Sequence, residues 1–61
     1  MLYYYMEFEG HMGGGIRIRA KSEEDAISNA ENPANWRDHE KRKVCYIEVD
    51  NDGDRIYSKR L

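Results

Sequence analysis

The sequence has little capacity for the covalent cross-links that usually stabilise a very small domain. It contains one proline among 61 residues. Its one cysteine, Cys45, has no second cysteine to pair with, so no disulfide can form within the chain. A lone cysteine is typical of proteins built for a reducing compartment. We therefore expect a cytoplasmic protein whose stability comes from packing or from a partner subunit.

Long apolar runs and an excess of one charge are also missing. The longest apolar run, Met1 to Met6, is far shorter than the roughly 20 residues that cross a bilayer, and it lacks the basic start of a signal peptide. Ten Lys and Arg against 12 Asp and Glu leave a net charge of −2, which gives no bulk attraction to phosphate backbones or anionic lipid. We expect no membrane partner, and nucleic acid is not the default ligand.

What the chain does have is enough apolar material for one modest core. Hydrophobic residues make up 39% and charged residues 36%, a composition typical of a folded and very soluble domain. A chain of this length buries only about 60% of its unfolded surface. The prediction is a single domain spanning residues 1–61.

The first third of the chain alternates apolar and polar residues with the period of two that half-buried strands show. In the stretch 2–9 the residues predicted to point inward are Leu2, Tyr4, Met6 and Phe8. In the stretch 16–21 they are Ile16, Ile18 and Ala20. Antiparallel pairing would set an acidic outer row beside a basic one. The stretch Gly10–Gly15 between them is predicted to be a mobile loop.

A helix is predicted to begin after Ser22. The Ser22 hydroxyl suits an N-cap, and three acidic residues follow it where the positive end of the helix dipole would lie. A narrow apolar stripe is formed by Ala26, Ile27 and Ala30. Pro33 disfavours helical geometry at Asn32, so the helix should end or kink there. A second helical turn within 33–40, with Pro33 at its first position, would fold Trp36 back onto the core.

A hairpin is predicted for the C-terminal third, with strands over 43–50 and 54–60 and a turn at Asp52-Gly53. Centring the turn there sets Val49 opposite Ile56 and Asp50 opposite Arg55. The residues then predicted for the inner face are Cys45, Ile47, Val49 and Ile56. Those predicted for the outer face are Tyr46, Glu48, Arg55, Tyr57 and Lys59. The fold class predicted is α+β: a four-stranded antiparallel sheet with one helix packed on one face, in the order ββαββ.

Candidate chemistry along the chain is sparse. The glycines at 13–15 precede a strand and lack a following Lys and Ser or Thr, which argues against a phosphate loop. The run 50–54 begins like a calcium loop, but its glycine is misplaced and Leu61 stands where the final glutamate belongs. The spacings of His11, His39 and Cys45 match no zinc pattern, and a domain this small offers little cavity for a substrate. We expect no metal, no cofactor and no enzymatic activity.

Tyrosines on the predicted outer face are the feature that most suggests a function. Strand propensity alone would place some there, but four on one face, beside arginines, have the composition of a protein-binding hot spot. The predicted contact residues for a partner protein, or for a second copy in a homodimer, are Tyr3, Tyr5, Arg17, Arg19, Tyr46, Arg55 and Tyr57. Two alternatives stay open: the rings stack the bases of single-stranded RNA, or the first or last strand, lying at an edge of the sheet, adds its backbone to a partner's sheet.

The run from Ile16 to Ala30, IRIRAKSEEDAISNA, followed by a charged connection and a terminal hairpin, resembles small phage-encoded proteins of ββαββ order, among them anti-CRISPR inhibitors. The resemblance covers residues 16–60 and is architectural. It implies a viral protein in the host cytoplasm that blocks a host defence complex by stoichiometric binding. Inhibitors of this build are often more basic than this chain, which leaves the target open.

Overall fold

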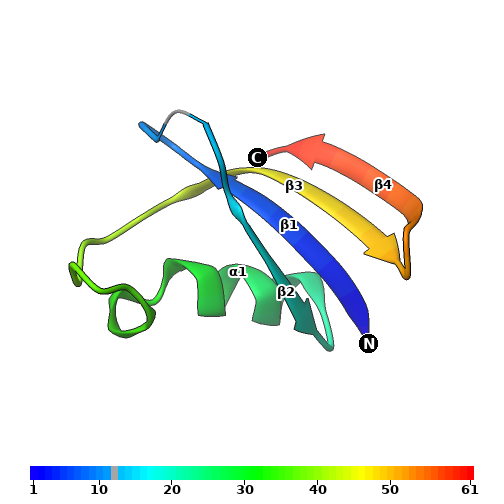
Figure 1. Ribbon diagram of the computed structural model, residues 1–61, viewed down its shortest axis with the longest axis horizontal. Coiled ribbons are helices and arrows are strands. Elements are labelled where there is room, and N and C mark those ends of the chain that lie inside the picture. Colours follow the sequence, from blue (N-terminus) through cyan, green and yellow to red (C-terminus); the bar gives the residue numbers. More distant parts are fainter. Residues whose placement is uncertain (12) are drawn as a thin grey trace.

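The chain forms one helix and four strands, arranged as a helix layer against an antiparallel sheet (Figure 1). The computed structural model describes residues 1–11 and 13–61. The elements in chain order are β1 (Leu2–Phe8), β2 (Ile16–Ala20), α1 (Glu23–Glu31), the 3-10 turn η1 (Pro33–Asn35), β3 (Val44–Asn51) and β4 (Asp54–Arg60). The predicted fold class is confirmed. The predicted mobile loop Gly10–Gly15 includes Met12, which lies outside the described residues.

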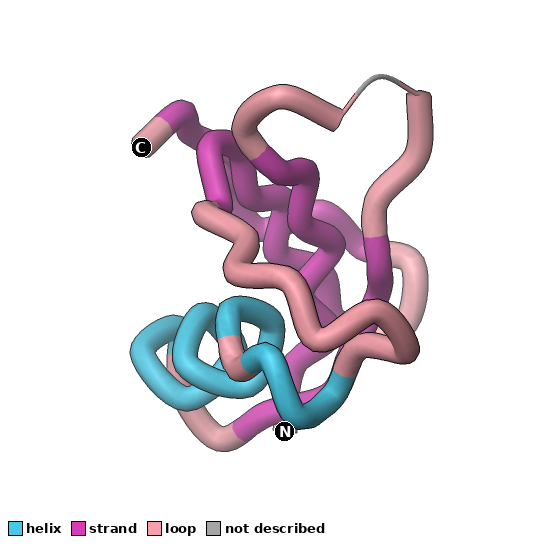
Figure 2. Tube along the Cα trace, turned by 90° about the vertical axis from the view of Figure 1, so that its left-hand side faces the viewer, coloured by secondary structure: helices cyan, strands magenta, loops and turns pink. Residues whose placement is uncertain are grey.

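The strand order β2-β1-β3-β4 places β1 and β3 at the centre of the sheet and β2 and β4 at its edges. The prediction that the first strand lies at an edge is therefore wrong. Both hairpins are antiparallel, and β1 joins them by pairing with β3, for example Tyr4 with Val49. The helix lies across one side of the sheet (Figure 2), where it packs against β2, β1 and β3. We call this side the inner face and the opposite side the outer face.

The core lies between α1 and the two central strands. Its buried residues are Tyr4, Met6, Phe8, Ala20, Ala26, Ala30, Val44, Ile47 and Val49. The helix contributes small alanines, which let its backbone approach the sheet closely. Trp36 covers the end of the core: its ring meets Phe8 edge-on at 5.3 Å between centroids, and its Nε1 donates a hydrogen bond to the Ala30 carbonyl at 2.8 Å.

The predicted helix boundaries are confirmed. The Ser22 Oγ accepts a hydrogen bond from the Asp25 backbone N–H at 3.1 Å, so it caps α1 as the sequence predicts. The helix ends at Glu31, before Pro33. The second helical turn is only η1, and the Asn32 Oδ1 caps it by accepting from Ala34 N–H at 3.0 Å. Among the described residues, no helix is long and apolar enough to cross a bilayer.

The predicted inward position of Cys45 is wrong. The register between β1 and β3 shifts after Glu7, so that Phe8 pairs with Val44 and Cys45 becomes an extra residue. Val44 is 2% exposed and takes the core position, while Cys45 is only half-buried. Unbroken alternation would have turned Lys43 inward as well, and the bulge avoids the burial of that charge.

The predicted inward position of Ile56 is also wrong. The turn aligns Asp50 with Arg55 as predicted, but the register then shifts and Val49 pairs with Tyr57. Ile56 is left 51% exposed. An inward Ile56 would face a helix that packs mainly on β1, β2 and β3 and meets β4 at Glu23, a charged residue. Tyr57 in its place directs a polar tip toward the helix.

Candidate functional site

The outer face of the sheet is the candidate binding surface, because α1 packs on the inner face. Alternation along the paired strands, interrupted by the register shifts in β3 and β4, determines which side chains it carries. The outer face comprises Arg17 and Arg19 from β2; Tyr3, Tyr5 and Glu7 from β1; Tyr46, Glu48 and Asp50 from β3; and Arg55, Ser58 and Arg60 from β4. Arginines therefore line both edges, and the centre holds tyrosines and carboxylates.

Arg17 links β2 to β3 across the intervening strand. Its Nη2 donates to the Asp50 Oδ2 at 2.7 Å, and its guanidinium carbon lies 4.0 Å from the centroid of the Tyr3 ring. Arg19 approaches the same ring at 5.6 Å. The Arg17 guanidinium also lowers the pKa of the Asp50 carboxyl. Tyr3 is thus held by cation–π contacts with two arginines.

Tyrosine hydroxyls are paired with carboxylates in the centre of the outer face. The Tyr5 hydroxyl donates to the Glu7 Oε2 at 2.9 Å, and the Tyr46 hydroxyl donates to the Glu48 Oε1 at 2.6 Å. These hydrogen bonds to carboxylates raise the pKa of both phenols. Strand pairing sets Tyr5 beside Glu48 and Glu7 beside Tyr46. The four side chains form one polar cluster across β1 and β3.

The β4 edge adds two arginines to this cluster. Arg55 Nη2 lies 3.7 Å from the Glu48 Oε1, and the guanidinium carbon of Arg60 lies 5.6 Å from the centroid of the Tyr46 ring. Sequence reasoning omitted Arg60, together with Glu7, Glu48 and Asp50, from the site. The alternation had already placed Glu48 outward and Asp50 opposite Arg55. The position of Arg60 depends on the bulge, which the pattern does not reveal.

Six of the seven predicted contact residues lie on the outer face, and the placement of Tyr57 there is wrong. Tyr57 lies on the inner side of β4, where its hydroxyl donates to the Glu23 Oε1 at 2.6 Å. Lys59, also predicted to face outward, lies on the same inner side with its Nζ 2.9 Å from the Glu23 Oε2. The hydrogen bond to Glu23 raises the pKa of Tyr57 to about 12 and lowers that of the Glu23 carboxyl. The physical cause of the misplacement is the one-residue register shift in β4.

Side chains with catalytic or metal-binding potential are dispersed. His11 lies beside the Phe8 ring, whereas His39 is exposed in the connection before β3. In residues 1–11 and 13–61, no three His, Cys, Asp or Glu side chains are grouped as a metal site. The outer face, by contrast, brings side chains of three tyrosines, four arginines and three carboxylates together on one side of the sheet.

Comparison with known proteins adds no relative. No protein-family model, no curated protein and no solved structure matches the chain.

Proposed function

We propose that the protein is a non-catalytic binding module whose outer sheet face contacts a partner protein in a stoichiometric complex. The observation that carries this proposal is the combination of three partly buried tyrosines with four arginines on one open sheet face. Tyrosine and arginine are the residues most enriched at binding hot spots, since each contributes a large contact area and a polar tip.

Internal contacts prepare this face for binding. The hydroxyls of Tyr5 and Tyr46 are hydrogen-bonded to neighbouring carboxylates, and Tyr3 lies against the Arg17 guanidinium. Side chains already held in one conformation lose less entropy when a partner covers them. The contacts therefore favour association with a surface that matches the existing arrangement.

The distribution of charge favours a protein over a nucleic acid. Three carboxylates occupy the centre of the face, where they would repel a phosphate backbone. The Tyr3 ring is also in contact with Arg17, and a nucleobase would have to displace that guanidinium in order to stack there. A protein surface with basic groups at its centre and acidic groups at its sides would complement the pattern.

The resemblance to phage-encoded inhibitors adds a hypothesis about the partner. Under this hypothesis the complementary surface belongs to a host defence complex, and binding blocks that complex by occupying it. A homodimer formed through the same face is the competing possibility.

The structure supplies a matched test, because Tyr46 and Tyr57 lie on opposite sides of the sheet. A partner captured from host lysate by the wild-type protein is purified and titrated with the wild type, Tyr46→Ser and Tyr57→Ser. We expect Tyr46→Ser to weaken binding about thirtyfold, equivalent to about 2 kcal/mol. Tyr57→Ser should leave affinity within about threefold. Denaturant unfolding of each variant checks that the fold is retained.

Equal affinity of all three proteins for the captured partner would contradict the proposal. Sedimentation of the wild type alone tests the competing possibility. A dimer that dissociates on Tyr46→Ser but not on Tyr57→Ser would show that the outer face binds a second copy.

A further inference from the structure

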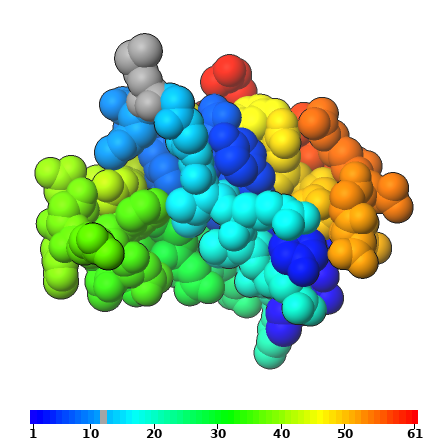
Figure 3. Space-filling view, viewed as in Figure 1, coloured from blue at the N-terminus to red at the C-terminus, as the bar shows by residue number. Residues whose placement is uncertain are grey.

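The free edge of β2 differs from the outer face and has its own binding chemistry. β2 pairs with β1 along one side and lies at the margin of the sheet. In the space-filling view it lies at the surface, beside the helix (Figure 3). A strand at a sheet edge presents backbone N–H and C=O groups that can pair with another strand.

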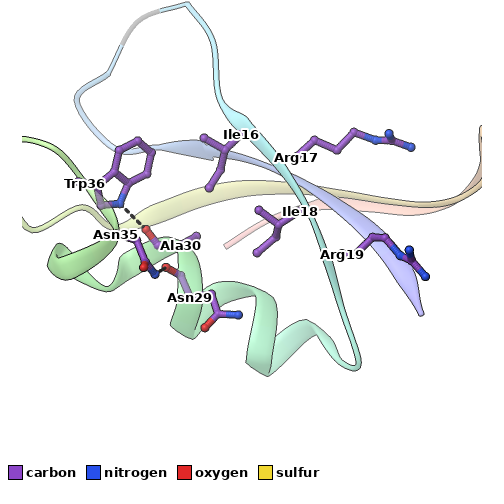
Figure 4. A pocket seen from close by; sticks show the side chains of 8 residues that line it. All are labelled: Ile16, Arg17, Ile18, Arg19, Asn29, Ala30, Asn35 and Trp36. Atoms are coloured by element: carbon purple, nitrogen blue, oxygen red, sulfur yellow. Dashed lines mark hydrogen bonds between the residues drawn. The ribbon is translucent and has the colours of Figure 1, made fainter.

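A groove of about 430 Å³ runs beneath this edge, between β2 and the end of the helix. The side chains that line it on the inner face are Ile16, Ile18, Asn29, Ala30, Asn35 and Trp36. Figure 4 shows the two isoleucines directed toward the helix, and Arg17 and Arg19 directed away from it. The Asn35 Nδ2 donates to the Asn29 carbonyl at 2.9 Å. The groove therefore has a largely apolar floor and a fixed polar rim.

We propose that the edge of β2 binds an extended segment of a partner protein in which apolar residues alternate with Asp or Glu. A strand added beside β2 would direct every second side chain into the groove. The side chains between them would lie beside Arg17 and Arg19 on the outer face, where a carboxylate is favoured. Edge position, groove and charge thus specify the same alternating pattern.

β3 provides an internal precedent for such a segment. In the run 47–50 its Ile and Val are buried, while its Glu and Asp face outward. The Asp50 carboxylate of that run already pairs with Arg17 from the opposite side of β1. Arg17 thus reaches a carboxylate two strands away, across β1. Its side chain remains 49% exposed.

A second copy of this chain is a poor occupant of the site. The other edge, β4, carries Arg55, Lys59 and Arg60, so pairing of β2 with β4 would bring like charges together. Pairing of β2 with another β2 would do the same with Arg17 and Arg19. The charge complementarity is with an acidic segment from a different protein.

The experiment uses the synthetic peptide Ac-Glu-Val-Glu-Val-Glu-NH2 and isotope-labelled protein. We expect titration to shift the backbone amide signals of residues 16–20, with binding at least tenfold tighter than for a Lys-Val-Lys-Val-Lys peptide. A peptide of the same composition ordered Glu-Glu-Val-Val-Glu controls for charge alone. Methylation of one set of alternate peptide nitrogens should abolish binding, whereas methylation of the other set should be tolerated.

A groove-filling variant gives an independent readout. Asn29→Trp replaces an exposed helix residue that lines the groove, and we expect it to weaken peptide binding at least tenfold. Ser28→Trp alters the adjacent exposed helix residue outside the groove and should leave binding unchanged. Shifts confined to the amides around Tyr46, or equal binding of the two variants, would overturn the proposal. Neither variant alters the outer face, so this test and that of the proposed function fail separately.

Discussion

The two edge strands of the sheet are held in different ways. β2 rests on the helix: its Ala20 is 6% exposed, and its two isoleucines pack against the core. Every residue of β4 is exposed, and this strand reaches the helix through the contacts of Tyr57 and Lys59 with Glu23. Apolar packing is little affected by salt and pH, whereas exposed polar contacts are screened by solvent. The two edges should therefore respond very differently to substitution.

The largest expected difference is between the glycines that precede the two edge strands. A Cβ at Gly15 would overlap the Met6 carbonyl oxygen, so we expect Gly15→Ala to lower the free energy of unfolding by about 3 kcal/mol. Gly53 has a φ of +95° and open space around its Cα, and Gly53→Ala should cost about 1 kcal/mol of backbone strain. Urea unfolding of both variants measures the difference. A cost at Gly53 equal to that at Gly15 would show that the close approach of β2 to β1 is not as described.

The isoleucines of the two edges give a second, smaller comparison. Ile18 is partly buried against the core, so Ile18→Ala should lower the free energy of unfolding by about 1.5 kcal/mol. Ile56 is 51% exposed, and Ile56→Ala should change that free energy by less than about 0.5 kcal/mol. Both values come from the same urea titrations. If Ile56→Ala were the more damaging change, β4 would pack in the register that the alternation predicts and not in the observed one.

The smallest expected effect is the pH dependence of the contact between Tyr57 and Glu23. The pKa of Tyr57 is raised from 10.0 to about 12 in the folded state, so its stabilising contribution is complete below pH 10 and is lost as the pH rises toward 12. The magnitude should stay under about 1 kcal/mol, because the pair is exposed and solvent screens it. The free energy of unfolding is measured between pH 9 and 12 for the wild type and Tyr57→Phe. The wild type should show the steeper decline.

At low pH, the change in the free energy of unfolding is expected to come from Glu23. Its pKa is lowered from 4.5 in the folded state, first by the Tyr57 hydroxyl and then by Lys59. Its contribution is therefore present above pH 4.5 and is lost as the pH falls through the lowered value. Glu23→Gln should make the free energy of unfolding less dependent on pH in this acidic range. An unchanged pH dependence would mean that the helix end does not hold β4.

The same contrast between edges separates what the sequence predicts from what it does not. The first hairpin keeps unbroken alternation, and Ser22 and Pro33 mark the helix ends, so the pattern predicts β1, β2 and α1 correctly. In the second hairpin the Asp52-Gly53 turn is correct, but one extra residue reverses the faces of every residue after it. The alternation of apolar and polar residues does not reveal where such an extra residue is inserted. The strand pairing shows that Tyr57 takes the inner position expected for Ile56, and its hydroxyl reaches Glu23 at the start of the helix.

In the candidate site, too, the faces of residues before the bulge could be predicted and those of residues after it could not. Tyr3, Tyr5, Arg17 and Arg19 lie in unbroken alternation, and Arg55 lies between the turn and the bulge, so their faces could be predicted. Tyr57 lies beyond the bulge and could not. The link from Arg17 to Asp50 and the groove beneath β2 depend on the strand order, which alternation leaves undetermined.

The central position of β1 also determines when the protein can fold during synthesis. Tyr4 pairs with Val49, so most of the chain lies between two strands that are neighbours in the sheet, and closing that long loop slows folding. A nascent chain that has emerged as far as α1 holds only a two-stranded hairpin, which is marginally stable alone. Its apolar face and the unpaired side of β1 stay open to other chains until β3 leaves the ribosome. We therefore expect the interval before residue 51 emerges to be the period in which this protein is most prone to aggregation.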